Sequence, residues 1–449
     1  MKQQLVNRQC NQRGQIPGRG ILLLGLLLCL LCLGACQRIE YTTIDSPAYL
    51  RVFNSINQIQ AMDTKGDTLS YLCMLINPTL GADGMPIEAE IVGDFLDQRD
   101  RYAPPYPSHI GVSTTVNNPE YPGKESVLVA PILNGFDLSS WAQVPSGELR
   151  FMFMYRPRNE VPFFQLEKRY QKSMLVDTTL HLAAGEVYTL QTLLKDFHTK
   201  ERGVLLRQEN FHKIPLSDSL VYVNFYNYSA KGYADADRLF KLPMSTNMEN
   251  LFQLGVRDTM NVYMTLFDGQ DFSVYMDGIV LNNYEQVSPD YVAKYITTVR
   301  RQDADGRANP YVSFPLWVSD AQNGIHTDLW QRFYFLAPGM HIEQNRFDEQ
   351  AGFYLNHLGG VMGNTDGTFA ALNFILNGPK IYDPNAPCAN CGANSYHTYH
   401  AGVNFPNLII NTHSGVYNPR SFASVNTVEI INGQVYLTTI QRQYAPPAY

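Results

Sequence analysis

Short segments rich in aromatic and β-branched residues, each followed by a turn, constrain the fold of this chain more than any other feature. Residues 48–54 carry Tyr, Leu, Val and Phe and end on the turn-forming Asn54. We predict further strands at residues 68–76, 126–132, 148–155, 187–194 and 222–227. Turn signals separate several of them, at Asn134-Gly135, Pro145-Ser146-Gly147 and Ala184-Gly185. Short strands joined by turns are typical of a sandwich or barrel, so the sequence predicts a mostly β protein.

Helical signals are sparse. The best helix candidates, residues 163–172 and 288–300, show only a weak 3.6-residue apolar period. Only 17% of the residues are charged, whereas the chain has 28 Tyr and 23 Phe, a balance that favours strands. Cys73 lies in the apolar run at residues 70–76, and we predict that it is a buried free thiol.

The N-terminus has the layout of a signal peptide. Four basic residues without any acid precede an apolar run at residues 21–33, which is too short to span a bilayer of about 30 Å. The run ends at Leu33-Gly34-Ala35-Cys36, which resembles the lipobox of bacterial lipoproteins. We predict cleavage before Cys36 and lipid on its thiol, with residues 36–47 as a tether. The alternative is a chance cysteine after an ordinary signal peptide, since Cys29 and Cys32 lie in the same region.

Removal of residues 1–35 changes the formal charge from −7 to −11, because the leader carries four basic residues and no acid. Nucleic acids and anionic lipids are bound through clustered Lys and Arg, and the remaining sequence has no such cluster. We therefore exclude nucleic acid as a partner. Two acyl chains on Cys36 would give stable membrane anchoring.

An internal similarity predicts two domains. Residues 49–54 and 222–227 both begin with Tyr, alternate in polarity and end with Asn, although two strands rich in Tyr and Val can match over six residues by chance. The polar segment 202–219, which contains Pro215, is predicted to link the domains. We place a β-sandwich at residues 48–217 and a second β-rich domain at 218–449, which a further boundary near residue 345 would divide.

Several of these segments resemble tandem domains of unknown function in Bacteroidota lipoproteins. The resemblance covers about residues 48–230 and is carried by residues 138–153, 182–190, 204–206 and 220–227. It implies tandem Ig-like antiparallel β-sandwiches, lipid anchoring at the outer membrane and no established activity. Arg51 keeps a basic residue of the family pattern, whereas Asn224 departs from it, and residues 240–449 match poorly. The side of the membrane that the protein faces is left open.

A cysteine and histidine cluster near the C-terminus carries the only candidate metal site. Cys388 and Cys391 are separated by two residues and are followed by His397, His400 and His413. Two thiolates with two imidazoles would form a tetrahedral zinc site. In an oxidising compartment neighbouring cysteines usually form a disulfide, so we favour a Cys388–Cys391 disulfide and keep zinc on Cys388, Cys391, His397 and His400 as the alternative. A c-type haem is excluded because Gly392 stands where that motif needs histidine.

No motif for catalysis is present, so we predict that the protein is not an enzyme. The sequence lacks a nucleophile elbow, a His-Glu-x-x-His zinc motif and a phosphate-binding loop. Asp303-Ala304-Asp305-Gly306 starts like a calcium loop without its later ligands and is interpreted as a turn. Trp141, Trp317 and Trp330 could stack on sugar rings, although aromatic residues in strands are usually core.

Three classes of function remain after these exclusions. The favoured one is a noncatalytic binding or interaction lipoprotein of the cell envelope, with a glycan or an envelope protein as its partner. The first alternative is a structural subunit of a fimbrial or adhesin-like surface assembly. The second is a polysaccharide hydrolase whose catalytic acids are dispersed along the sequence.

The two fates of Cys388 and Cys391 differ in their effect on unfolding. A disulfide in so short a loop removes little entropy from the unfolded chain, whereas the binding free energy of zinc is part of the folding free energy. We expect no bound metal and no change in melting temperature with a chelator, with His397→Ala or with His400→Ala. Stoichiometric zinc together with a transition that responds to the chelator would contradict the disulfide.

Overall fold

The regular structure of the described residues consists of strands and short 3-10 turns. The computed structural model describes residues 43–56, 70–99, 106–107, 127–159, 161–171, 173–237, 256–268, 294–316, 318–320, 324–326, 329–339, 354–355, 361–362, 369–374, 381–382, 396–397 and 424–441. Within these ranges the sheets are mainly antiparallel, so the mostly β class is confirmed. A search of the same residues for a helix with the length and apolarity needed to cross a membrane finds none.

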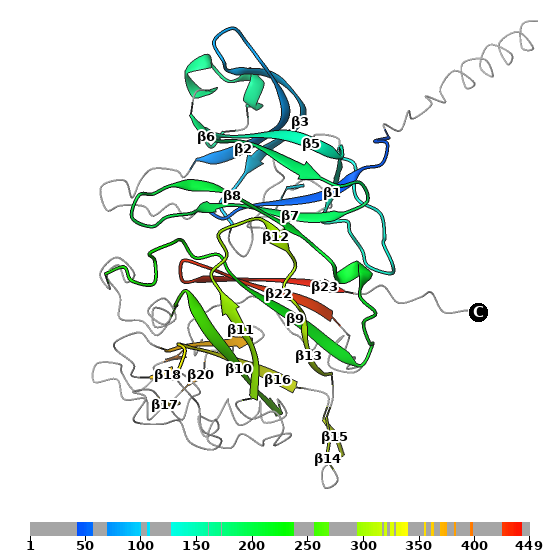
Figure 1. Ribbon diagram of the computed structural model, residues 1–449, viewed down its shortest axis with the longest axis vertical. Coiled ribbons are helices and arrows are strands. Elements are labelled where there is room, and N and C mark those ends of the chain that lie inside the picture. The colour runs from blue at the N-terminus through cyan, green and yellow to red at the C-terminus, as the bar shows by residue number, and fades with distance from the viewer. Residues whose placement is uncertain are drawn as a thin grey trace, which may run out of the picture. The chain divides into compact units, whose positions relative to one another are not determined.

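Two sheets are built mainly from the first half of the chain (Figure 1). We call them the first outer and the first inner sheet. The outer sheet has the order β3 (Pro86–Leu96), β2 (Tyr71–Leu80), β5 (Gly147–Arg156) and β6 (Met174–Leu182). The inner sheet has the order β12 (Gly306–Arg307), β8 (Arg202–Gln208), β7 (Val187–Leu194), β1 (Ala48–Asn54) and β4 (Ala142–Val144).

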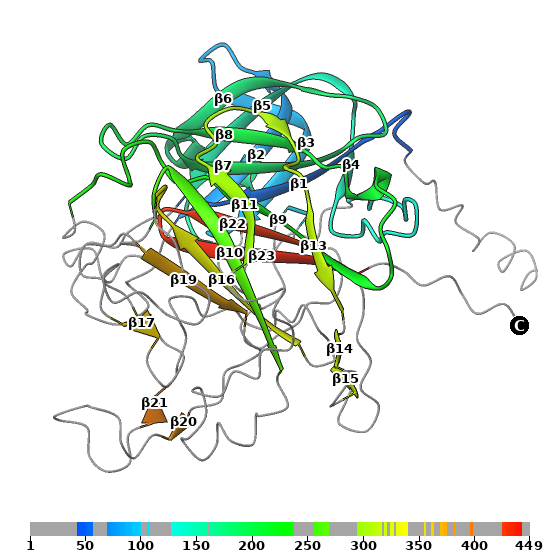
Figure 2. The same ribbon diagram turned by 60° about the horizontal axis from the view of Figure 1, so that its bottom comes forward.

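The second half forms the second inner and the second outer sheet (Figure 2). The inner sheet has the order β13 (Val312–Pro315), β9 (Leu220–Asn227), β22 (Ser424–Ile431) and β23 (Gln434–Gln441). The outer sheet has the order β11 (Lys294–Arg300), β10 (Thr259–Asp268), β16 (Leu329–Leu336) and β19 (Phe369–Phe374). Three short two-stranded pairs complete the described strands: β14 (Val318–Asp320) with β15 (Gly324–His326), β17 (Tyr354–Leu355) with β18 (Val361–Met362), and β20 (Ile381–Tyr382) with β21 (Tyr396–His397).

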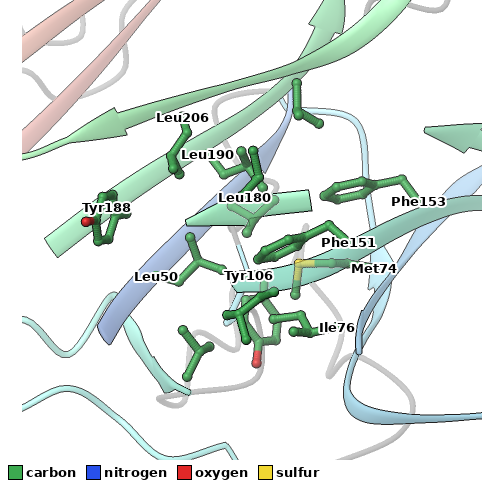
Figure 3. Close-up of a cluster of buried hydrophobic side chains, with 14 of the residues drawn as sticks. Leu50, Met74, Ile76, Tyr106, Phe151, Phe153, Leu180, Tyr188, Leu190 and Leu206 are labelled. Atoms are coloured by element: carbon green, nitrogen blue, oxygen red, sulfur yellow. The ribbon is translucent and has the colours of Figure 1, made fainter. Parts of the chain in front are cut away.

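Each inner sheet packs against its outer sheet through apolar side chains. In the first half Leu50 and Leu190 of the inner sheet meet Met74 and Phe151 of the outer sheet (Figure 3). In the second half Phe225 of β9 contacts Phe333 of β16 with ring centroids 5.2 Å apart. Burial of apolar surface at about 25 cal/mol per Å² makes these two cores the main source of stability.

The opposite faces of the inner sheets are buried as well. Every residue of β1 and of β22 is buried, so neither strand has a side that faces solvent. Apolar clusters join the two inner sheets at both ends of their strands: Val187 and Val425 share one cluster, and Leu193 and Ile431 share another. Side chains alternate along a strand, so the residues between those of the outer cores face the opposite inner sheet.

Strand pairing in the second half repeats that of the first half. The two outer sheets follow the same order in the chain, and in each inner sheet the first strand pairs in parallel with a late strand: β1 with β7, and β9 with β22. The corresponding strands in chain order are β1 and β9, β2 and β10, β3 and β11, β4 and β13, β5 and β16, β6 and β19, β7 and β22, and β8 and β23.

The asparagines that end β1 and β9 close the same local turn through Oδ1, whereas their Nδ2 groups donate to carbonyls at different places, the end of β3 and the segment before β10. Asn54 Nδ2 donates to the carbonyl of Leu96, and its Oδ1 accepts the backbone N–H of Ile56. Asn227 Nδ2 donates to the carbonyl of Arg257, and its Oδ1 accepts the backbone N–H of Ser229. Each amide therefore closes a local turn and ties the inner sheet to the chain beside its outer sheet.

Most predicted strands are present, but some segments were interpreted wrongly. β1 and β7 have the predicted bounds, and the segments at 68–76, 148–155 and 222–227 correspond to β2, β5 and β9. The predicted strand 126–132 is wrong, since its described part contains only an isolated bridge at Val129. Asn134 and Gly135 both have positive φ, as their turn requires.

Both predicted helices and the predicted linker are also corrected. Residues 163–172 contain two 3-10 turns, Phe163–Gln165 and Lys168–Gln171, because Gln171 Nε2 satisfies the carbonyls of Phe163 and Leu166 that a longer helix would use. The described part of 288–300 is strand β11. The segment 202–219, predicted as a linker, begins with β8, whose alternating side chains are buried on both faces.

Removal of the amide at Asn227 is expected to destabilise the fold. In Asn227→Ala the buried N–H of Ser229 loses its acceptor, at a cost of about 1–3 kcal/mol, and the partly buried carbonyl of Arg257 loses its side-chain donor. Urea unfolding measures the change. Thr179→Ala, at an exposed position of β6, serves as the control and is expected to change stability by about 0.5 kcal/mol or less. Equal losses in the two variants would contradict the role given to Asn227.

Candidate functional site

Five charged side chains lie together between the two inner sheets. They are Arg51, Arg99, Arg207, Glu209 and Glu429, each at most 5% exposed. Three guanidinium groups thus stand against two carboxylates in a region removed from water. We call this set the buried charge cluster. Charged groups are rarely buried unless they are paired, so the contacts of each member determine what the cluster can do.

Arg207 is the centre of the cluster. It follows Leu206 in β8, and the alternation of that strand directs Leu206 into the outer core and Arg207 toward the second inner sheet. Its Nε donates to Glu209 Oε1 at 2.9 Å, and its Nη1 donates to Glu429 Oε1 at 2.6 Å. Nη1 also donates to the hydroxyl of Tyr228. Arg207 therefore bridges a carboxylate of the first half and one of the second half.

Arg99 supplies the second partner of Glu429. Its Nη1 lies 2.5 Å from Glu429 Oε2, and its guanidinium lies over the rings of Phe53 at 3.9 Å and Tyr436 at 4.4 Å. Gln191 Nε2 also donates to Glu429 Oε1. The carboxylate of Glu429 is thus held by two arginines and one amide, all of them contributed by the first half of the chain.

Arg51 is arranged differently from the other two arginines. Its Nη2 donates to Thr189 Oγ1 at 3.3 Å, and that hydroxyl donates in turn to Glu209 Oε1. The guanidinium lies 3.9 Å from the centre of the Trp141 ring. The Trp141 indole N–H donates to the carbonyl of Tyr188, which fixes the ring that Arg51 covers. Arg51 contacts the carboxylates only through Thr189.

The pKa values of Glu429 and Arg207 show that attraction between opposite charges outweighs the effect of burial. Burial opposes ionisation of Glu429, but attraction by Arg99 and Arg207 prevails and lowers its pKa to about 2. Burial would lower the pKa of Arg207, but Glu209 and Glu429 raise it well above its ordinary value. Both groups are therefore charged near neutral pH. Their charges therefore attract each other across the two inner sheets.

The residues singled out from the sequence are not members of this cluster, with the exception of Arg51. Cys36, Cys388, Cys391 and His400 lie outside the described residues, and His397 belongs to β21, of which the backbone alone is described. Their lipidation, disulfide and zinc interpretations stay predictions. Among the described residues no group of three or more His, Cys, Asp or Glu side chains is placed to hold a metal ion.

The predicted aromatic, thiol and turn residues lie in the core, in strands or in a turn wherever the structure describes them. Trp141 is 1% exposed, so the interpretation as a sugar-stacking residue is wrong for it and the core interpretation is confirmed. Trp317 lies outside the described residues, and Trp330 belongs to β16. Cys73 is buried in β2, as expected. Asp305 Oδ1 accepts the backbone N–H of Leu206, a structural role consistent with the predicted turn.

The sequence alone does not reveal the buried charge cluster. Arg99, Glu209 and Glu429 are ordinary charged residues when the sequence is considered alone, and Arg207 lay in the segment interpreted as a linker. A usable signal was present in β22, where Thr427 and Glu429 alternate with Val428 and Ile430 in a strand otherwise rich in apolar residues. Such a pattern normally predicts one solvated face, and here that face is covered by another sheet.

Comparisons with known proteins do not assign this chain to a family. No protein-family model matches the sequence, and no curated protein shows significant similarity to it. The resemblance to tandem domains of Bacteroidota lipoproteins therefore stays a prediction.

Loss of the Glu429 charge is expected to destabilise the protein strongly. In Glu429→Gln, Arg99 and Arg207 keep their charges but lose a shared carboxylate, and breaking a buried pair in this way costs about 3–5 kcal/mol. Asp177→Asn is the matched control, because it breaks the exposed Arg150–Asp177 pair and should cost about 1 kcal/mol or less. The free energy of unfolding in urea measures both changes. Similar losses would show that the cluster does not hold the sheets together.

Acid is expected to weaken the protein through Glu429. Because folding lowers the pKa of this carboxyl from 4.5 to about 2, its contribution is fully present above about pH 5. The contribution is lost as the pH falls toward 2, and the shift corresponds to roughly 3 kcal/mol. Unfolding free energies at pH 7, 5 and 3 measure the loss in the wild-type chain. The pH dependence over this range should be shallower in Glu429→Gln, and an unchanged pH dependence would contradict this assignment.

Proposed function

We propose that this chain is a noncatalytic interaction lipoprotein of the cell envelope, anchored in the outer membrane by lipid on Cys36. The observation that carries the proposal is the burial of the charge cluster. A catalytic constellation must reach its substrate, whereas Glu209 and Glu429 are covered by both inner sheets and are occupied by arginines. The cluster therefore supports a stable scaffold in preference to a reaction centre.

The scaffold consists, in this proposal, of two Ig-like β-sandwiches in tandem. The repeated pairing of eight strands supports two copies of one unit, and so does the turn that Oδ1 of Asn54 and of Asn227 closes at the end of the first strand of each copy. Corresponding residues also meet across the inner sheets, as Val187 does with Val425 and Leu193 with Ile431. A contact in which each unit uses the same face is the arrangement of a symmetric dimer.

Rigid coupling of the two sandwiches fits an interaction protein. Domains joined only by a linker move independently, whereas these inner sheets share two apolar clusters and a charge cluster. A block of this kind would hold its surface loops at fixed spacing and so reduce the entropy lost when a partner binds. The partner proposed is a glycan or another envelope protein.

The anchor and the binding activity need separate tests. Labelling with a radioactive fatty acid should mark the wild-type protein and not Cys36→Ser, while both forms keep the same melting temperature. Label retained by Cys36→Ser would reject the anchor. If Cys36→Ser loses both the label and its fold, the labelling is repeated with Cys36→Ala. This variant removes the same thiol without adding a hydroxyl, and it should also remain unlabelled.

The binding activity is tested with the intact chain in detergent. Affinity electrophoresis through a panel of polysaccharides, combined with crosslinking to envelope proteins, should give retardation or a discrete adduct without shortened products. Shortened polysaccharides would show a hydrolase and overturn the noncatalytic proposal. Self-association into polymers of increasing length by analytical ultracentrifugation, without retardation or an adduct, would replace binding with a structural role in a surface assembly.

A further inference from the structure

Charge in the buried cluster does not balance. Glu209 is paired with Arg207, and Glu429 is paired with Arg99 and Arg207. Arg51 is the third guanidinium, and no carboxylate of the described residues forms an ion pair with it. With all five groups ionised the cluster carries one excess positive charge. An isolated charge removed from water is costly, so a buried cluster of this composition needs a further negative group.

The donors of Arg51 show where that group would bind. Among the described residues, Arg51 makes a single hydrogen bond, the 3.3 Å contact of Nη2 with Thr189 Oγ1, and its buried Nε has no hydrogen-bond partner. The rings of Trp141 and Phe53 lie 3.9 Å and 5.0 Å from the guanidinium carbon. Stacking on a ring leaves the N–H groups directed along the guanidinium plane, where an acceptor can approach.

The pKa values of Arg51 and Arg207 agree with their different contacts to the carboxylates. Burial lowers the pKa of Arg51 to about 10, although Glu209 and Glu429 attract its charge. The two carboxylates therefore compensate the desolvation of Arg51 only in part. Arg207, which is equally buried, has its pKa raised because it contacts both carboxylates. The two arginines differ because, within the described part of the chain, Arg51 contacts no carboxylate directly.

We infer that the Nε edge of Arg51 binds one small inorganic anion between the two inner sheets, with chloride as the natural candidate. Arg51 is 3% exposed, so a ligand with an extended chain could not reach it without separating the sheets. A monovalent anion neutralises the excess charge of the cluster, whereas a divalent anion would reverse it. The anion would act as a structural counterion that adds to the contact between the two halves.

Anion-dependent stability provides the solution test. The melting temperature of the intact chain is measured while chloride replaces gluconate at constant ionic strength. A ligand that binds only the folded state raises stability with the logarithm of its concentration once its dissociation constant is exceeded. We expect such a rise for the wild type and for the control Arg150→Met, which removes an exposed guanidinium. We expect no chloride dependence in Arg51→Met.

Crystallography with bromide locates the ion independently of any variant, which keeps the inference testable if Arg51→Met does not fold. A bromide anomalous peak within hydrogen-bond distance of Arg51 Nε, together with the chloride-dependent melting temperature, would establish the site. A water molecule at that position would overturn it. So would a melting temperature indifferent to chloride, or an equal chloride dependence in Arg51→Met and the wild type.

Discussion

Burial of both faces of the inner sheets is the constraint on which the rest of the structure depends. A strand in an ordinary sandwich needs one apolar face and can leave the other to solvent, but β1, β7 and β22 have to supply two interiors at once. The faces toward the outer sheets are apolar, as in any sandwich core. The faces between the inner sheets keep polar and charged residues, and these are tolerated only because they form pairs. Arg207 and Glu429 are therefore as much a part of the core as the leucines behind them.

The two repeated units carry different residues at a position where identical charged residues would repel each other across the interface. Gln191 and Glu429 occupy equivalent positions in the two units. Gln191 of β7 pairs with Phe53 of β1, and Glu429 of β22 pairs with Tyr226, the equivalent residue of β9. These corresponding residues hydrogen-bond across the interface. Two glutamates there would repel each other, so amide against carboxylate is the compatible combination. Arg99 and Gln302 also correspond, because each donates its backbone N–H to the asparagine that ends the first strand. Equivalent backbone positions in the two units thus carry different side chains, an amide in one unit and a charged group in the other.

How far the sequence predicts this structure depends on whether a feature is local. Alternation and turn residues predict β1, β7 and the Asn134-Gly135 turn, and the similarity of residues 49–54 to 222–227 corresponds to matching strands. The 3.6-residue signal at 288–300 was too weak to oppose pairing with β10, which makes its described part a strand. The charge cluster could not be predicted, because Arg207 and Glu429 are 222 residues apart and only the packing of the sheets brings them together.

The position of Glu429 near the end of the chain affects how the protein can fold. During synthesis the first inner sheet can form as soon as β8 is complete, yet its edge partner β12 comes about a hundred residues later and the carboxylate for Arg99 and Arg207 later still. Contacts this distant in sequence form slowly, because a long loop must close before they contribute. Until β22 arrives, the first unit exposes a face on which three arginines are opposed by one carboxylate, that of Glu209, beside apolar residues. That charge would keep two partly folded chains from associating through this face.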